Sequence, residues 1–285
     1  MSFNLGFIGG GNMSTSIMRG IINKDGHPAS NIWVSGPNLK NLKHWQESGI
    51  NVTTKNGAVF ANCNFIFLGV KPAMLETAVE DSFETLPATT QSNNIVIISM
   101  LAGVTLEKIK KVFNNFNFPY SITVVRIMPN VSMAVGSGSC LMTCEKGTTN
   151  DQKESIIKLL NCCGACEEVP ESLMNNLGVL TACGPAYIFI VIEALADGAV
   201  KQGVPRDLAL RFAAQTVMGS AHLVLESGIH PAQLKDMVCS PGGTTICGIS
   251  VLEDNKIRSA FINAIEASVN KTHKIESQTA KDAKK

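Results

Sequence analysis

The sequence predicts a doubly wound α/β domain followed by an all-α domain. Short apolar runs recur along the first half of the chain, and each is followed by a helical pattern. Such runs are typical of parallel strands that are buried on both faces of a sheet. From about Ser172 onward the pattern is helical almost throughout. With 285 residues, of which 45% are hydrophobic and 16% charged, the chain is long and apolar enough to form two domains.

The elements of the first domain alternate in the order that a doubly wound sheet requires. Strands are predicted at 5–8, 31–35, 52–54, 65–70, 95–99, 123–128 and 165–169. Helices are predicted at 14–23, 37–47, 57–63, 73–79, 106–112 and 153–160. Gly, Pro and Asp residues at the ends of these runs indicate turns.

The second domain is predicted to contain only helices, at 173–180, 186–202, 206–226, 231–238, 245–252 and 255–274. The segment 187–192 is apolar on every side, which is typical of a helix inside a large core or between subunits. We therefore expect a dinucleotide-binding type of domain over 1–165 and a helical domain over 166–275. The polar residues 276–285 predict a disordered tail.

Charge and hydropathy exclude some classes of partner. The formal net charge of +1 predicts no attraction to nucleic acid or to an anionic membrane. The start of the chain lacks the features of a secretory or transit peptide. We also expect no membrane span, because no apolar stretch of about 18 to 20 residues is free of charged and turn residues. These observations together predict a cytoplasmic protein.

The nine cysteines raise the question of a metal site. Cys162, Cys163 and Cys166 lie close together, but no second pair of ligands follows at the spacing of a zinc site. Small buried thiols in a reducing compartment explain the cysteines better, so no metal is expected.

A glycine-rich loop lies directly after the first strand. Gly9 allows a tight turn, Gly11 lets the backbone approach a pyrophosphate, and Ser14 stands where a small residue is needed for helix–strand packing. The helix that follows presents free N–H groups to phosphates. Because the loop opens a series of βα units, the sequence predicts a Rossmann-type dinucleotide site rather than an ordinary turn.

The end of the second strand bears on the choice of cofactor. A site for NAD usually has Asp or Glu there, whereas this chain has Ser35 and a neutral turn, followed by Lys40 and Lys43. This composition favours the 2′-phosphate of NADP over NAD; the alternative is that the lysines lie on a solvated helix face.

Three more turns follow predicted strands, at 69–72, 102–103 and 128–130. Ligands of open α/β sheets bind outside the carboxyl ends of the strands. Together the three turns therefore predict the rim of a nicotinamide crevice.

A second loop, Ser240–Thr245, lies between two predicted helices. Its sequence is Ser-Pro-Gly-Gly-Thr-Thr, so its backbone N–H groups can converge on an anion at a helix start. A capped turn between helices is an equally good interpretation of the loop alone.

These segments resemble the pyrroline-5-carboxylate reductases along nearly the whole chain. The resemblance rests on 7–13, 70–72, 126–130, 184–187, 193–197, 215–216, 230–236, 240–246 and 252–253. The segment 240–246 is highly specific to that family, whereas 7–13 is shared with many dehydrogenases.

The resemblance implies a Rossmann domain followed by an all-α dimerisation domain, and reduction of Δ1-pyrroline-5-carboxylate to L-proline by NAD(P)H. It implies a homodimer formed through the helical domain and allows a higher ring of dimers. Thr245 would be catalytic, near the ring nitrogen. Substrate-binding positions would be Glu171, Ser240, Gly242, Gly243, Thr244 and Thr245. Cofactor-binding positions would be Ile8, Gly9, Gly10, Gly11, Asn12, Met13, Ser35, Asn56, Val70, Lys71, Pro72 and Ala102.

The chain departs from the family pattern in two places. It has Val131-Ser132 where the family commonly has Thr-Pro, and Ala182-Cys183 where the family has Gly-Ser. Both changes lie beside expected site loops, so they bear on substrate affinity rather than on the type of reaction.

Two other functions are considered. A β-hydroxyacid dehydrogenase usually has a catalytic Lys on the first helix after the Rossmann domain, and 173–180 has none. A protein that only senses NADP would not need the second anion site at 240–245. Hydride addition to a protonated imine needs no strong protein base, which agrees with the lack of an evident catalytic Lys or His. Glu193 and Asp197 are interpreted as helix caps or interface partners.

Overall fold

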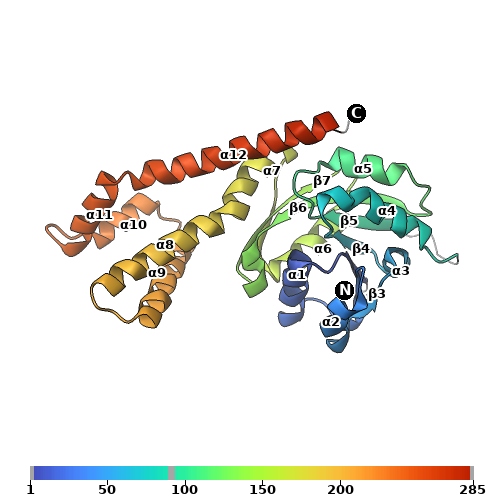
Figure 1. Ribbon diagram of the computed structural model, residues 1–285, viewed down its shortest axis with the longest axis horizontal. Coiled ribbons are helices and arrows are strands. Elements are labelled where there is room, and N and C mark those ends of the chain that lie inside the picture. The colour runs from blue at the N-terminus through green and yellow to red at the C-terminus, as the bar shows by residue number, and fades with distance from the viewer. Residues whose placement is uncertain (1–2, 89–93, 283–285) are drawn as a thin grey trace. The chain divides into compact units, whose positions relative to one another are not determined.

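The computed structural model describes residues 3–88 and 94–282, with side chains up to residue 274 (Figure 1). The chain forms two compact units. The first comprises the residues up to Ala182 together with those from Thr272 onward, and the second comprises Cys183–Lys271. Each unit is described by itself.

The first unit is built on one eight-stranded sheet with the order β3-β2-β1-β4-β5-β6-β7-β8. All neighbouring strands are parallel except β6 and β7, which are antiparallel. The strands are β1 Leu5–Ile8, β2 Ile32–Ser35, β3 Asn51–Thr53, β4 Phe65–Leu68, β5 Asn94–Ser99, β6 Ser121–Pro129, β7 Gly138–Cys144 and β8 Gly164–Glu168. The order is reversed on either side of β1, as in doubly wound folds.

Helices cover both faces of this sheet. They are α1 Asn12–Asn23, α2 Lys43–Glu47, α3 Asn56–Asn62, α4 Leu75–Glu84, α5 Leu106–Asn114, α6 Asn150–Asn161 and α7 Glu171–Gly178. Side chains of α1 and α6, among them Ile17 and Leu159, pack into a core on one face. Side chains of α3, α4 and α5, among them Phe60, Val79 and Ile109, form the core on the other face. The fold class predicted from the sequence is therefore confirmed.

Strand β7 was not predicted. Its sequence, Gly-Ser-Cys-Leu-Met-Thr-Cys, has few β-branched residues and follows a short 3₁₀ turn, Val131–Val135. Its place is fixed by pairing with β6, in which Arg126 lies opposite Thr143. This pairing adds an antiparallel step to the otherwise parallel sheet.

The units divide at residue 182, whereas the sequence placed the boundary at 165. The difference arises because β8 pairs with β7 and α7 follows directly from β8, so both belong to the sheet unit. The second unit contains α8 Gly184–Lys201, α9 Arg206–Ser227, α10 Pro231–Val238, α11 Thr244–Asp254 and most of α12 Ile257–Asp282. A π-helical turn, Val179–Cys183, precedes α8.

Helical backbone in α12 continues to Asp282, over most of the segment that the sequence assigned to a disordered tail. The residues concerned include Glu276, Gln278 and Ala280, which have good helix propensity. Extending an existing helix costs far less than starting one, since each added residue gains a hydrogen bond.

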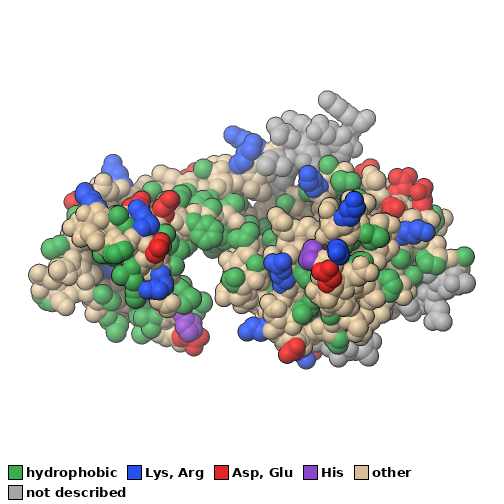
Figure 2. All heavy atoms as spheres, turned by 60° about the horizontal axis from the view of Figure 1, so that its bottom comes forward, with side chains coloured by type: hydrophobic (Ala, Val, Ile, Leu, Met, Phe, Trp, Pro, Cys, Tyr) green, Lys and Arg blue, Asp and Glu red, His purple; other side chains and the backbone are tan. Residues whose placement is uncertain are grey.

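Apolar side chains are exposed over much of the helical unit. Phe189, Phe212, Met218 and Leu225 are between 59% and 80% exposed. Figure 2 shows such side chains at the surface of this unit. Two helical segments, Glu171–Lys201 and Arg206–Ser227, are long and apolar enough to cross a membrane by length and composition. The sequence analysis had expected no segment of this kind.

His27 gives the first unit a pH dependence. Its ring is 3% exposed and stacks on Phe3 at 5.1 Å between ring centroids. Burial lowers the pKa of His27 below its ordinary value of 6.5. As the pH falls, His27 therefore becomes protonated in the unfolded chain at a higher pH than in the folded protein.

We expect the free energy of unfolding to fall as the pH drops below about 6.5 and to stop falling below the folded-state pKa. His27→Phe keeps an aromatic ring and removes this dependence. Denaturant unfolding of both proteins between pH 7.5 and 5 measures the difference. The prediction would be contradicted if the free energy of unfolding changed equally with pH in the native protein and in His27→Phe.

Candidate active site

The loop after β1 has the tight geometry that its glycines predict. Gly9 has φ of +95°, and a Cβ there would lie 2.8 Å from the carbonyl oxygen of Gly69. The amide of Gly9 donates to the carbonyl of Ser35 at 3.0 Å. Ser14 is buried and packs beside Gly69, so it provides the small third position of the motif. The loop therefore places the start of α1 beside the carboxyl ends of β1, β2 and β4.

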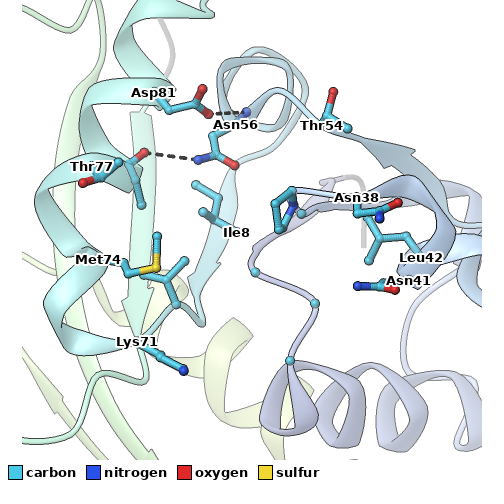
Figure 3. Close-up of a pocket in the computed structure, with 17 residues that line it drawn as sticks. Ile8, Asn38, Asn41, Leu42, Thr54, Asn56, Lys71, Met74, Thr77 and Asp81 are labelled. Atoms are coloured by element: carbon cyan, nitrogen blue, oxygen red, sulfur yellow. Dashed lines mark hydrogen bonds between the residues drawn. The ribbon is translucent and has the colours of Figure 1, made fainter.

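A pocket of about 600 Å³ opens at this edge of the sheet (Figure 3). Asn38, Asn41 and Leu42 lie on one side of it, and Lys71, Met74 and Thr77 on the other. Its size falls in the range of small-molecule and cofactor sites. The complete lining is Ile8, Gly9, Gly10, Gly11, Gly36, Pro37, Asn38, Asn41, Leu42, Thr54, Asn56, Val70, Lys71, Met74, Thr77, Ala78 and Asp81.

Residues of this pocket fit a dinucleotide. A Cβ at Gly11 would point into open space, where the nearest atom is the Gly69 oxygen at 4.0 Å. Gly11 is also the N-cap of α1 and has no side chain, so it offers no side-chain acceptor to the first N–H groups of that helix. A helix start of this kind can bind a pyrophosphate.

Ser35 lies behind the pocket rather than in its lining. Its hydroxyl is fully buried and donates to Asn56 Oδ1 at 2.6 Å. The Asn56 amide N–H donates to Asp81 Oδ2 at 3.1 Å, and its side-chain NH₂ donates to the carbonyl of Ala78 at 3.3 Å. Ser35 therefore orients Asn56, which does line the pocket. Asp81 was missed because its contact joins α4 to the start of α3, and no local pattern indicates it.

The two lysines used to predict a 2′-phosphate site are absent from the pocket lining. Lys43 instead pairs with Glu47 at 3.6 Å on an exposed helix face. The amides of Asn38 and Asn41 stand at the end of β2. The Asn38 side chain accepts from the amide of Lys40 at 2.9 Å, which leaves its NH₂ group able to donate to a ligand.

Four further predicted cofactor positions, Asn12, Met13, Pro72 and Ala102, are not part of the pocket lining. Asn12 and Met13 are the first two residues of α1, and Pro72 starts a short 3₁₀ turn after Lys71. Ala102 is exposed in the turn between β5 and α5. Of the twelve predicted positions, the structure places these in the pocket lining: Ile8, Gly9, Gly10, Gly11, Asn56, Val70 and Lys71.

The second loop, in the helical unit, forms a tight turn that starts α11. The amide of Gly243 donates to the carbonyl of Ser240 at 3.0 Å, and Gly242 has φ of +66°. Gly243 is the N-cap of α11 and makes no side-chain cap, so it contributes no cap bond to the first N–H groups of this helix. Thr244 and Thr245 are its first two residues. A helix start without a side-chain cap can bind an anion.

Glu171 lies in the other unit, at the start of α7. Its Oε1 accepts from the amide of Leu106 at 2.9 Å and lies 3.5 Å from Arg126 Nη1. Both contacts were missed by the sequence analysis, which treated Glu171 only as a substrate-binding position. No short-range pattern links these residues, because they come from three different elements.

Of the three clustered cysteines, Cys163 is buried as predicted, whereas Cys162 and Cys166 are partly exposed. Cys163 is fully buried, and burial raises its pKa to about 12, so it is protonated at neutral pH. Among the residues that the structure describes, no three His, Cys, Asp or Glu side chains are arranged to hold a metal ion.

Comparisons with known proteins agree with this geometry. Residues 171–275 match the family model described as pyrroline-5-carboxylate reductase dimerisation. Residues 4–103 match the model described as NADP oxidoreductase, coenzyme F420-dependent.

Whole-chain relatives are also found. The chain is 38% identical to pyrroline-5-carboxylate reductase 3 of Danio rerio over 279 residues, which covers 98% of this chain and 93% of the relative. A pyrroline-5-carboxylate reductase structure from Coxiella burnetii has a TM-score of 0.85 at 32% identity, covering 96% of this chain and 98% of that one. A Plasmodium falciparum pyrroline carboxylate reductase structure with NADP bound has a TM-score of 0.80 at 30% identity, covering 95% and 97%. With relatives of this similarity over nearly its full length, the chain belongs to the pyrroline-5-carboxylate reductase family.

Proposed function

We propose that this protein reduces the cyclic C=N bond of Δ1-pyrroline-5-carboxylate with NAD(P)H to give L-proline, the last step of proline biosynthesis. The observation that carries the proposal is the full-length match to reductases of this family, 38% identical over 98% of the chain. The glycine-lined pocket and the uncapped turn before α11 provide the two kinds of anion site that the reaction needs.

Different residues bind the cofactor and the substrate in this reaction. Gly9–Gly11 and the start of α1 bind the pyrophosphate, and Asn56 and Lys71 line the same pocket. When bound, the reduced dinucleotide supplies the hydride. The N–H groups at the start of α11 hold the substrate carboxylate, and the Thr245 hydroxyl hydrogen-bonds the ring nitrogen. With the reactants aligned in this way, no strong protein base is required.

The direct test is to follow NADPH absorbance with the purified full-length protein. We expect oxidation that depends on added pyrroline-5-carboxylate, with proline formed in equal amount. Omission of the substrate is the control. NADPH loss that does not depend on the substrate, or no loss at all, would refute the proposed reaction.

We also propose that NADPH is preferred and that NADH is used less well. A relative with 30% identity has been solved with NADP bound. In this chain the end of β2 carries neutral amides and no carboxylate that would repel a 2′-phosphate.

Asn38→Asp tests this preference. Asp keeps the acceptor for the Lys40 amide and adds one negative charge to the pocket. We expect KM for NADPH to rise about tenfold, because one repulsion near a phosphate costs about 1.4 kcal/mol. KM for NADH should change little. Asn150→Asp, on exposed α6 outside the pocket, is the matched control. An equal rise for both cofactors would contradict the prediction.

The helical unit serves as an oligomerisation domain, as the family model over 171–275 indicates. We propose a homodimer formed through this unit and no insertion into a membrane, with a ring of dimers as a higher assembly. The exposed side chains of α8 and α9 supply the apolar surface for it. Light scattering without detergent, giving a mass above one chain, tests the assembly.

Cytoplasmic localisation is part of the proposal and is supported by nine free cysteines.

A further inference from the structure

The carboxylate of Glu171 joins three elements of the sheet unit. It stands at the start of α7, accepts from the amide of Leu106 at the start of α5, and faces Arg126 on β6. Both contacts are made to the same oxygen, Oε1, at 2.9 Å and 3.5 Å. Glu171 therefore accepts from the first N–H group of α5, next to the N-cap Thr105, whose hydroxyl accepts from Lys108.

Arg126 orients this carboxylate. Its side chain is 2% exposed, and among the described residues it is the largest fully buried side chain by volume. Its Nη1 faces Glu171, and its Nη2 donates to Asn175 Oδ1 at 3.4 Å. Glu171 and Asn175 are one turn apart on α7, so the guanidinium contacts the same face of the helix twice. Because a buried guanidinium charge without a charged partner is strongly destabilising, Arg126 keeps the Glu171 carboxylate beside it.

The segment 100–105 is held between this carboxylate and the cofactor pocket. At its first end, the amide of Met100 donates to the carbonyl of Leu68 at 3.1 Å. The Met100 side chain packs against Gly69, where a Cβ would lie 2.8 Å from its methyl carbon. Gly69 in turn lies beside Gly9 of the phosphate loop. At its other end, the segment is fixed by the bond from Leu106 to Glu171.

This segment follows β5 and stands at the carboxyl edge of the sheet, next to the turn after β4 that lines the pocket. In doubly wound folds, the dinucleotide extends along that edge from the switch point. A shift of this segment would therefore displace the reacting end of the dinucleotide rather than its phosphates.

We propose that Glu171 is a positioning residue: oriented by Arg126, its carboxylate fixes the 100–105 segment and thereby the alignment of the nicotinamide ring for hydride transfer. This inference rests on the proposed reaction. It also gives Glu171 a role different from the direct substrate contact that the family resemblance implies. A reacting distance that is wrong by about 1 Å can cost up to about a hundredfold in rate.

Three variants of the full-length protein separate the two roles. Glu171→Ala removes the acceptor. Glu171→Gln retains Oε1 and can keep both contacts. Glu168→Gln is the matched control, because Glu168 lies on β8 in the same surface pocket as Glu171 but pairs with Lys153, at 2.7 Å, and not with Leu106 or Arg126. The measurements are kcat, KM for pyrroline-5-carboxylate, the deuterium isotope effect on kcat with C4-deuterated NADPH, and hydrogen exchange at Leu106.

For Glu171→Ala we expect kcat to fall about tenfold or more, with KM for the substrate within about twofold of the native value. The isotope effect should increase, because hydride transfer becomes rate-limiting, and the Leu106 amide should exchange faster. Glu168→Gln should stay within about twofold of the native kcat, and Glu171→Gln, which keeps the acceptor for Leu106 but loses the charge beside Arg126, should lose less kcat than Glu171→Ala.

A rise in KM for the substrate with an unchanged isotope effect would overturn the positioning role in favour of direct contact. An unchanged kcat, or unchanged exchange at Leu106, would also overturn it. An inactive native protein is a different outcome, because it refutes the proposed reaction. In that case, slow hydrogen exchange of the Leu106 amide that is lost in Glu171→Ala would still show that the carboxylate holds the start of α5.

Discussion

Gly11→Val is expected to weaken NADPH binding by at least about a hundredfold while the protein remains folded. Gly11 is exposed in the pocket lining, and an added Cβ would lie no closer than 4.0 Å to the Gly69 oxygen. Its φ of −72° is also allowed for Val. The branched side chain would occupy the space where the pyrophosphate must approach the start of α1. Fluorescence titration with NADPH measures the loss.

The melting temperature provides the control for this variant. Val is a poorer N-cap than Gly, so a decrease of up to about 3 °C is expected. Gly9→Ala should decrease it more, because the positive φ and the short approach to Gly69 both oppose a side chain. Normal NADPH affinity in Gly11→Val would show that the pyrophosphate does not bind at this loop.

Thr245→Ala is expected to lower kcat about a hundredfold and to leave the dissociation constant of NADPH unchanged. The reason is that Thr245 belongs to the helical unit, on the second residue of α11, whereas the dinucleotide pocket lies entirely in the sheet unit. Loss of the hydroxyl removes the hydrogen bond to the ring nitrogen and not the cofactor contacts. Stopped-flow or steady-state assays give kcat, and titration gives the binding constant.

Ser250→Ala is a matched control for this change. It removes one hydroxyl from the same helix, where Ser250 only donates to the carbonyl of Ile246 at 3.1 Å. We expect activity within about twofold of the native protein. A parallel loss of turnover and NADPH binding in Thr245→Ala would mean that the loop is structural.

Much of the fold was predictable because its signals are local. Strand β1 and helix α10 have the bounds that the sequence predicted. Buried parallel strands are apolar on both faces and stand out in the sequence. Strand β7 lacks such a pattern, and only its pairing with β6 makes it part of the sheet. The unit boundary at 182 follows from the pairing of β8 with β7, which keeps β8 and the adjoining α7 in the sheet unit.

The candidate site was predictable to the extent that it depends on backbone conformation. The positive φ of Gly9 and the turn at Gly242 both require glycine, so they are visible in the sequence. Asn38 and Asn41 were missed because amides at a helix start are common in ordinary turns. Asp81 was missed because its partner, Asn56, is 25 residues away.

The sequence by itself determined the doubly wound fold, the phosphate loop and the turn before α11, since each depends on short-range periodicity or on glycine. The tertiary structure decided which side chains face the pocket. It placed Ser35 behind Asn56, directed Lys43 to Glu47, and joined Glu171 to Leu106 and Arg126. These contacts connect elements that are distant in the chain, so they exist only after the strands and helices have packed together.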